Sequence, residues 1–521
     1  MIRELARDYY AGVHAAASAS VDAEEEAQLT TPVANLFRAL ASEAGLGVFQ
    51  MVRETRLDRT RPDFAVLLTE HARTRQKGFI ELKGPSTSVD VTTWSGRNAR
   101  QWTSMAREAE ILIVCNGVAA QIYKDGEPYD GPATLPYTEP EAWDPSGLIR
   151  LLRLFVELDP TPIVSVRNLS ERLAHRTADL RDRLLWLLDQ SSPAADAAKG
   201  GLRAWRQHVQ PTGSPRDFAD GVSQVIAYGM VLAALSAGGA DADGDGFVTV
   251  MEAREALRQS NPVLAAAFAP LIDKPVLAGA TQVELGALET LISAIDADRV
   301  NASADPRGEP WLYFYEDFLS EYDPDERRQA GVYYTPVAIV RAMARIADHV
   351  LVERFGRRLG FADGSVVTLD PAAGSGAFPL AVIDQGVERA RQVRGAAGPR
   401  QAAANLARNL FAFELLPGPY SVAHLRLGTR LSKLLEPEPA VAAKVVLTDT
   451  LESPFQPPRR PLWLDGRIRA ADGGRGMVRH AVDHGYFSLA TARLQVRPHL
   501  ADRPRVGSPD ATLGAVCRGR T

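Results

Sequence analysis

The hydrophobic and polar positions along the chain fall into stretches with different periods. Residues 32–44 place apolar side chains at i, i+3, i+4 and i+7, which predicts a helix with one buried face. Residues 166–320 show mostly helical periodicity, whereas residues 331–455 alternate strand-like and helix-like segments, as a parallel sheet requires. The pattern therefore predicts two α/β regions joined by a helical connector. Apolar runs typical of buried strands occur at 64–68, 79–82, 111–115, 366–369, 410–413 and 445–447.

The end of the chain breaks this pattern. Residues 453–521 contain no Glu, Lys or Asn, are rich in Arg, Pro and Gly, and keep no helical or strand period for long. A frameshifted or decayed end would give such a composition, and a disordered tail is the alternative. At about 150 residues per domain, the chain length suits roughly three domains. The predicted boundaries are 1–165, 166–320 and 321–456, followed by an atypical tail at 457–521.

Composition sets limits on the class of protein. The two cysteines, Cys115 and Cys517, are too few for a disulfide framework or a zinc site. We expect neither a signal peptide nor a membrane span, and hence a cytoplasmic protein. The net charge of −5 argues only weakly against binding a polyanion, because a DNA-binding cleft needs only a local basic surface.

A glycine-rich segment follows the strand predicted at 366–369. It reads Asp370-Pro-Ala-Ala-Gly-Ser-Gly-Ala-Phe378 and precedes a helix-like stretch. Gly374 and Gly376 allow a tight turn and let a ligand approach the backbone without a Cβ in the way. Asp370 can accept a charge-assisted hydrogen bond from a cationic amine. This arrangement predicts a nucleotide-type cofactor site at the carboxyl end of a strand.

The full segment resembles the cofactor motif of adenine-N6 DNA methyltransferases, which bind S-adenosylmethionine. The resemblance implies a partial Rossmann-like methyltransferase domain. In this family, the segment matched by residues 331–336 closes over the methionine part of the cofactor, and we expect Thr335 to be a helix N-cap and Pro336 the first helical residue. Glu414 matches the acid that binds the ribose hydroxyls, and Asp449 the acid that recognises the adenine amino group. Taken singly, each acid could be a solvated strand end. The implied cofactor-binding residues are Tyr334, Thr335, Pro336, Asp370, Ala372, Gly374, Gly376, Phe378, Glu414 and Asp449.

One family motif is missing from the sequence. Members carry a [D/N/S]-P-P-[Y/F/W] tetrapeptide, whose polar groups bind the target amine while its aromatic ring stacks on the flipped base. No such tetrapeptide occurs here, and the nearest string, 453–455, lacks the second proline. We therefore expect this chain to hold the cofactor but not to methylate by the known mechanism on its own.

A second set of polar residues lies near the N-terminus. Asp63 opens one predicted strand, while Glu81 and Lys83 close another, and strand alternation puts those two on the same face. The chain has just seven lysines, and Lys83 belongs to its only E-x-K string. A lysine at a motif position is therefore less expected by chance. The set resembles the PD-(D/E)XK nuclease signature. This implies that Asp63 and Glu81 bind Mg²⁺, that Lys83 orients or activates the attacking water, and that Gln101 assists. A solvated hairpin is the alternative.

The residues do not decide which acid completes this predicted metal site. Glu24, Glu25 and Glu26 precede the predicted helix at 32–44, and any of them could contribute a ligand.

The order of these segments adds a resemblance to type IIG-like single-polypeptide restriction–modification enzymes, over about residues 20–455. It implies an α/β multidomain protein with a nuclease domain, a helical connector and part of a methyltransferase domain, acting on double-stranded DNA. No Walker-type G-K-[S/T] string occurs, so no helicase is expected. The missing motif leaves a second hypothesis open: a catalytically incomplete remnant that binds the cofactor or DNA and pairs with a separately encoded C-terminal half.

The predicted connector also contains an EF-hand-like string. Asp241, Asp243, Asp245 and Glu252 occupy the defining positions of a twelve-residue calcium loop. EF-hands usually work in pairs and no second loop is found, so an acidic insertion between helices is the alternative. Calcium binding is accordingly a secondary hypothesis.

Overall fold

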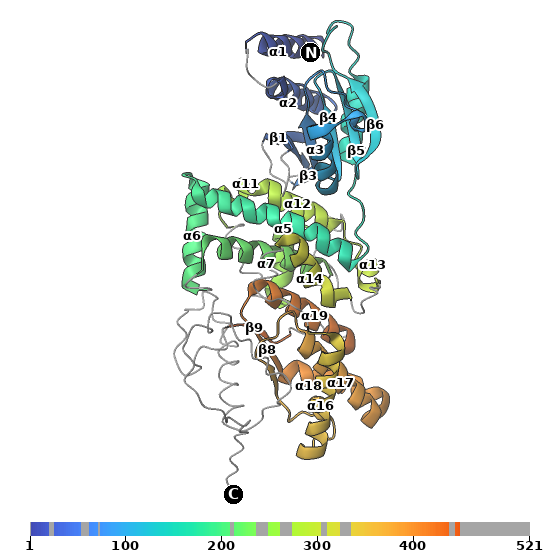
Figure 1. Ribbon diagram of the computed structural model, residues 1–521, viewed down its shortest axis with the longest axis vertical. Coiled ribbons are helices and arrows are strands. Elements are labelled where there is room, and N and C mark those ends of the chain that lie inside the picture. The colour runs from blue at the N-terminus through green and yellow to red at the C-terminus, as the bar shows by residue number, and fades with distance from the viewer. Residues whose placement is uncertain are drawn as a thin grey trace.

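The structure is a computed structural model of the chain. A region built on a six-stranded sheet, a helical region and a region built on a three-stranded sheet follow one another along the long axis (Figure 1). The mixed α/β architecture agrees with the coarse prediction of the fold class. The structure describes residues 2–19, 25–53, 62–70, 73–208, 213–235, 248–260, 273–303, 310–323, 335–436 and 443–448.

The N-terminal region contains a sheet whose strands follow chain order, β1 to β6. Neighbouring strands are antiparallel except β3 and β4, which are parallel because α3 crosses over between them. The described elements are α1 (Ile2–Ala19), α2 (Glu25–Glu43), β1 (Val48–Arg53), β2 (Phe64–Glu70), β3 (Arg73–Leu82), η1 (Val91–Thr93), α3 (Gly96–Glu108), β4 (Ile111–Cys115), β5 (Ala119–Lys124), β6 (Glu127–Thr134) and α4 (Ser146–Glu157).

Alternation along the strands sends side chains to two separate cores. Ile80 and Leu82 of β3 belong to the larger core, which also includes residues of α1, α2 and α4. Phe79 belongs to a smaller core on the other face, against Met105 of α3. Glu81 therefore lies on the α3 side of the sheet, which sets the position of the N-terminal candidate site.

The middle region consists of helices packed around a common apolar core. α7 has the length and apolar composition of a membrane span, but 83% of its most apolar window is buried inside the protein, as in a core helix. At the end of α14, the hydroxyl of Tyr322 donates to Asp220 Oδ1 of α7 over 2.6 Å. The described helices are α5 (Val166–Asp189), α6 (Pro193–His208), α7 (Pro215–Leu235), α8 (Val250–Ser260), α11 (Pro275–Ala280), α12 (Gln282–Ser293), α13 (Ala297–Ala302) and α14 (Pro310–Tyr322).

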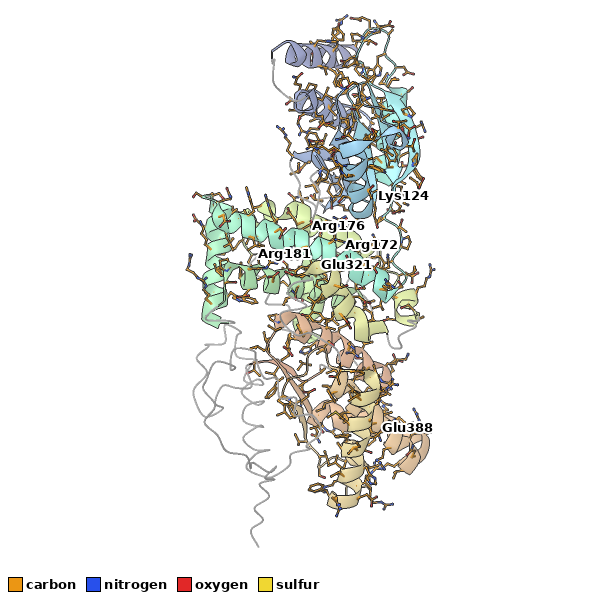
Figure 2. All side chains as sticks on the ribbon, in the orientation of Figure 1. Lys124, Arg172, Arg176, Arg181, Glu321 and Glu388 are labelled. Atoms are coloured by element: carbon orange, nitrogen blue, oxygen red, sulfur yellow. The ribbon has the colours of Figure 1, made fainter. Side chains whose placement is uncertain are left out.

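The N-terminal and helical regions meet along β3, α5 and α12. Arg172 of α5 forms an ion pair with Glu110, and the Arg176 guanidinium lies 5.9 Å from the ring centroid of Phe79. Thr290 of α12 donates to the carbonyl of Gln76 over 2.9 Å. In Figure 2, Arg172 and Arg176 lie along α5, on the side toward the N-terminal sheet. Through these contacts, the N-terminal sheet packs directly against the helices of the connector.

The C-terminal region holds a parallel sheet of three described strands in the order β7-β8-β9. It joins the connector through α19 and α7, so closely that a Cβ at Gly418 would lie 2.1 Å from Gln224 Oε1. The described elements are α16 (Val337–Phe355), η2 (Gly360–Ala362), β7 (Thr368–Asp370), α17 (Ala377–Arg394), η3 (Gly395–Ala397), α18 (Gly398–Asn409), β8 (Leu410–Glu414), α19 (Pro417–Leu435) and β9 (Val445–Leu447).

The N-terminal ends of two helices differ from the sequence predictions. The helix expected at 32–44 begins at Glu25, so Glu25 and Glu26 open it rather than precede it. Pro32 lies inside that helix, and a Cβ at Gly12 of α1 would lie 3.4 Å from its ring. Thr335 was expected as the N-cap and Pro336 as the first helical residue, but Pro336 has a ψ of 132°, which is not helical. Pro336 is therefore the N-cap, and the helix begins at Val337.

Candidate functional site

The first candidate site forms where β2 begins and β3 ends. The antiparallel register pairs Phe64 with Ile80, so Asp63, just before β2, lies beside the end of β3. Asp63 Oδ2 accepts a hydrogen bond of 2.6 Å from the backbone N–H of Leu82. The structure thus brings Asp63 next to Glu81 and Lys83, although Asp63 and Glu81 are 18 positions apart in the sequence.

Glu81, Lys83 and Gln101 form one hydrogen-bonded group. Lys83 Nζ donates to Glu81 Oε1 over 2.6 Å, and Gln101 Nε2 donates to the same oxygen over 2.7 Å. Lys83 Nζ also lies 3.4 Å from Gln101 Oε1. Glu81 and Lys83 are each only 2% exposed. Buried charges of this kind need a partner, and here each charge has one.

Two further side chains approach Lys83. Glu26 Oε1 of α2 lies 3.5 Å from Lys83 Nζ. The Trp94 ring centroid lies 5.7 Å from the same nitrogen, within the range of a cation–π contact. Of the three acids left open by the sequence, Glu26 is therefore the one observed at the site; the side chains of Glu24 and Glu25 lie outside the described residues. Trp94 carried no local signal in the sequence, because only the fold brings it to Lys83.

Burial dominates the electrostatics of the two carboxylates. It raises the pKa of Glu81 to about 7, opposed by the Lys83 ammonium and reinforced by the negative charges of Asp63 and Glu26. Burial likewise raises the pKa of Asp63, against the opposing hydrogen bond from Leu82. A cation among these carboxylates would favour their charged forms.

The donor set fits a hard divalent cation such as Mg²⁺. Glu81 Oε2 is buried and has no hydrogen-bond donor among the residues that the structure describes. In the same described part of the chain, no three His, Cys, Asp or Glu side chains gather into a complete metal cage. Mg²⁺ is commonly bound by only one or two carboxylates, with water and substrate phosphate filling the other positions. Asp63 and Glu81 are suited to that role.

The second candidate site lies at the carboxyl ends of β7 and β8. Asp370 is 3% exposed, and its Oδ1 accepts a hydrogen bond of 3.1 Å from Ala372 N, which turns the chain away from the strand. Gly374 and Gly376 have φ values of +58° and +85°, a region that glycine adopts without strain. A Cβ at Gly374 would have nothing within 4 Å, so this part of the loop faces open space. The loop can therefore be approached closely by a ligand.

Glu414 connects this loop to the second strand. Its Oε2 accepts from Gly374 N, and its Oε1 accepts from Leu415 N and Leu416 N, each over 2.8 Å. Burial raises the pKa of Glu414, and the three N–H donors oppose this shift. Because a carboxylate offers about four lone-pair positions, it can still accept a hydrogen bond from a ligand hydroxyl.

Several of the remaining residues predicted to bind the cofactor are described, and Thr335 lines a small hollow together with Ala377, the first residue of α17. Ala372 belongs to the loop and Phe378 to the first turn of α17, whereas Thr335 directly precedes Pro336, the N-cap of α16. Thr448, after β9, donates its backbone N–H to the Glu414 carbonyl over 2.8 Å. Tyr334 and Asp449 lie outside the described residues.

Of the predicted calcium ligands, Asp241, Asp243 and Asp245 lie outside the described residues. Glu252 is described: its Oε2 accepts from Thr249 N over 2.9 Å and from Thr249 Oγ1 over 2.7 Å. The Glu252 N–H donates back to Thr249 Oγ1 over 3.1 Å. These contacts form a capping box at the start of α8, a role that needs no metal.

The comparisons with known proteins bear on the second site. Residues 313–425 match the model of the family described as N-6 DNA Methylase. The match runs from α14 into α19 and includes the glycine loop and Glu414. It confirms the predicted resemblance to adenine-N6 DNA methyltransferases over this segment of the chain. A comparison with curated proteins gave no match.

Solved structures similar to this chain include restriction–modification enzymes. The DrdV–DNA complex is 20% identical, with a TM-score of 0.39, over 92% of this chain and 42% of the other. The ATP-dependent Type ISP enzyme LlaBIII bound to DNA is 17% identical, with a TM-score of 0.42, over 65% and 21%. The type IIG restriction endonuclease BpuSI is 14% identical, with a TM-score of 0.22, over 88% and 47%. The matched region spans less than half the length of each of these proteins.

Proposed function

We propose that this chain is a DNA restriction–modification protein of the type that serves phage defence. Its N-terminal region would be a Mg²⁺-dependent, PD-(D/E)XK-like DNA endonuclease. Its C-terminal region would be the S-adenosylmethionine-binding part of a site-specific adenine-N6 DNA methyltransferase. The observation that carries the nuclease assignment is the orientation of Glu81, with one oxygen held by Lys83 and Gln101 and the other buried without a described donor.

The chemistry of the nuclease site follows from these side chains. Asp63 and Glu81 would hold Mg²⁺, which when bound supplies Lewis-acid stabilisation of a phosphodiester and its attacking water. Lys83 would position that water and stabilise its deprotonated form. Gln101 would keep Glu81 in the rotamer that presents its second oxygen, and Trp94 would stabilise the Lys83 ammonium by a cation–π contact.

Cleavage of supercoiled plasmid tests the nuclease. Wild type, Lys83→Ala and the control Lys124→Ala would each be incubated with Mg²⁺, with and without S-adenosylmethionine. Lys124 ends β5 of the same sheet, three residues beyond Gln121, which pairs with Val114, the β4 partner of Glu81. We expect cutting by wild type and Lys124→Ala but not by Lys83→Ala. Equal cutting by Lys83→Ala would reject the assignment, as would a folded wild type that does not cut.

The cofactor assignment rests on the methylase segment and on the loop that Glu414 ties to β8. Asp370, the open face at Gly374, and Glu414 would contact the cofactor. Calorimetric titration of the full chain with S-adenosylmethionine tests this directly. Saturable binding is expected, and a flat titration of folded protein would reject the assignment without affecting the nuclease.

The missing tetrapeptide favours a second candidate for the C-terminal region, a cofactor- or DNA-binding remnant that does not methylate alone. A separately encoded C-terminal half would then supply the base-binding motif and target recognition. Transfer of a labelled methyl group to DNA separates the two. Cofactor binding without transfer supports the remnant, whereas transfer by this chain alone rejects it. Calcium binding at 241–252 stays a lesser proposal, which a flat calcium titration would end.

A further inference from the structure

One buried arginine binds the glycine loop at the residue after the one that Glu414 binds. Arg426 lies on α19, three residues after Ala423, and the two therefore share a face of the helix. α19 packs directly against the loop. A Cβ at Gly376 would lie 3.4 Å from Ala423 and 3.6 Å from Leu427 Cγ. The helix is therefore in place to fix the loop.

The contact itself is a charge-assisted hydrogen bond. Arg426 Nη1 donates to the Ser375 carbonyl over 2.8 Å and lies 3.4 Å from Ser375 Oγ. Arg426 is 4% exposed and Ser375 is 5% exposed. Ser375 stands between the two glycines with positive φ. In such buried surroundings, a bond between a guanidinium and a carbonyl is stronger and more directional than one between neutral groups.

Helix stabilisation does not explain the position of this charge. Ser375 directly precedes Gly376, the N-cap of α17, so Arg426 places a cation near the positive end of a helix dipole. Such a cation destabilises the helix slightly. Other contacts of Arg426 must offset this destabilisation, and the hydrogen bond to the Ser375 carbonyl is one of them.

The loop needs support of this kind because its sequence leaves it free to move. Two glycines in three residues widen the conformations open to the backbone, and a ligand must otherwise order them on binding. Glu414 holds the N–H of Gly374, and Arg426 holds the carbonyl of Ser375. These two side chains, one from β8 and one from α19, thus bind adjacent residues of the loop.

We propose that Arg426 is a positioning residue, which pre-forms the glycine loop for its ligand by fixing the Ser375 carbonyl. The inference rests on the proposed cofactor site. Without the hydrogen bond from Arg426 to Ser375, the loop is mobile in the free protein. The ligand must then order the loop on binding, which lowers the affinity.

The experiment compares wild type, Arg426→Gln, Arg426→Lys and the control Arg430→Gln in the full chain. Arg430 lies one turn further along α19 and pairs with Asp384 over 2.8 Å. One readout is the Kd for S-adenosylmethionine by calorimetry, and the other is amide exchange of a peptide spanning 371–378 in the free protein. We expect Arg426→Gln to raise Kd at least about tenfold and to speed loop exchange. Arg426→Lys should give intermediate values, because lysine is shorter and has no planar fork. Arg430→Gln should match wild type.

Each outcome decides the inference. Wild-type affinity and loop exchange in Arg426→Gln would overturn it. If Arg426→Gln does not fold, a folded Arg426→Lys decides: weaker binding with faster loop exchange supports the inference, and wild-type values overturn it. If wild type itself does not bind the cofactor, the proposed cofactor site fails. The rate of amide exchange in the 371–378 peptide then still shows whether Arg426 fixes the loop.

Discussion

The two candidate sites are built from different parts of the polypeptide. The N-terminal site is made of side chains: Glu81, Lys83 and Gln101 hold one another by hydrogen bonds, and Asp63 is held beside them by the backbone N–H of Leu82. The C-terminal site is made of backbone: a loop turns at Gly374 and Gly376, and neighbouring side chains bind its N–H and carbonyl groups. The N-terminal site can hold a cation, and the loop of the C-terminal site can be approached closely by an extended ligand. Their proposed activities require these two properties.

This contrast teaches that the two sites should fail in different ways. In the proposed nuclease site each side chain would have its own chemical role, so a nearly isosteric change of charge should remove activity without unfolding the sheet. In the proposed cofactor site the backbone conformation would be the functional feature. A single methyl group on a glycine should weaken binding there although no functional side chain is lost.

The largest effect is expected from Glu81→Gln. The amide keeps the shape of the side chain but removes a charged ligand of the proposed metal, so Mg²⁺-dependent cleavage should fall by about 100-fold or more. Glu127→Gln, at an exposed position where β6 begins on the same sheet, should cut like wild type. Initial rates on plasmid measure both. Wild-type rates for Glu81→Gln would show that this carboxylate is not part of the active centre.

The next largest effect is expected from Gly374→Ala. A residue other than glycine at φ +58° costs about 1–2 kcal/mol, and the new methyl group would project into the open face of the loop. Cofactor affinity should therefore fall about tenfold. Gly356→Ala is a matched control, because Gly356 has φ +64° and a Cβ there would also have nothing within 4 Å, but it is the C-cap of α16, at the end of that helix away from Pro336.

Titration calorimetry and thermal melting distinguish strain from ligand contact in these two variants. Similar losses of stability are expected in both, with loss of affinity only in Gly374→Ala. Equal affinity in the two variants would show that the open face of the loop does not receive the ligand.

The smallest effect concerns how the C-terminal sheet responds to pH. His424 Nε2 hydrogen-bonds the Val445 carbonyl over 3.1 Å, and burial lowers the pKa of His424 to about 4. The unfolded chain has the higher pKa, about 6.5, and takes up the proton first as pH falls. Stability from the neutral imidazole is thus complete above about pH 6.5 and is lost between there and pH 4.

Thermal melts between about pH 7.5 and 4.5 measure this response. We expect His424→Gln to flatten the pH dependence of the melting temperature by a few degrees relative to wild type. An unchanged slope would show that His424 titrates normally and does not hold β9 in this way.

Several elements could be predicted from the sequence because their signals are local. The apolar runs at 64–68, 111–115, 410–413 and 445–447 all correspond to strands, and the positive φ values of Gly374 and Gly376 suit the predicted tight turn. The β5–β6 hairpin was missed, although Asp125-Gly126 at its tip is a strong turn signal with positive φ at both residues.

The sequence by itself determined which chemical groups are available and where strands end, because apolar period, glycine spacing and short motifs act over a few residues. Only the tertiary structure decided which groups meet. Strand register brings Asp63 to Glu81, helix docking brings Glu26 and Trp94 to Lys83, and the packing of α19 brings Arg426 to Ser375. These contacts depend on how distant segments pack, and no local period encodes that.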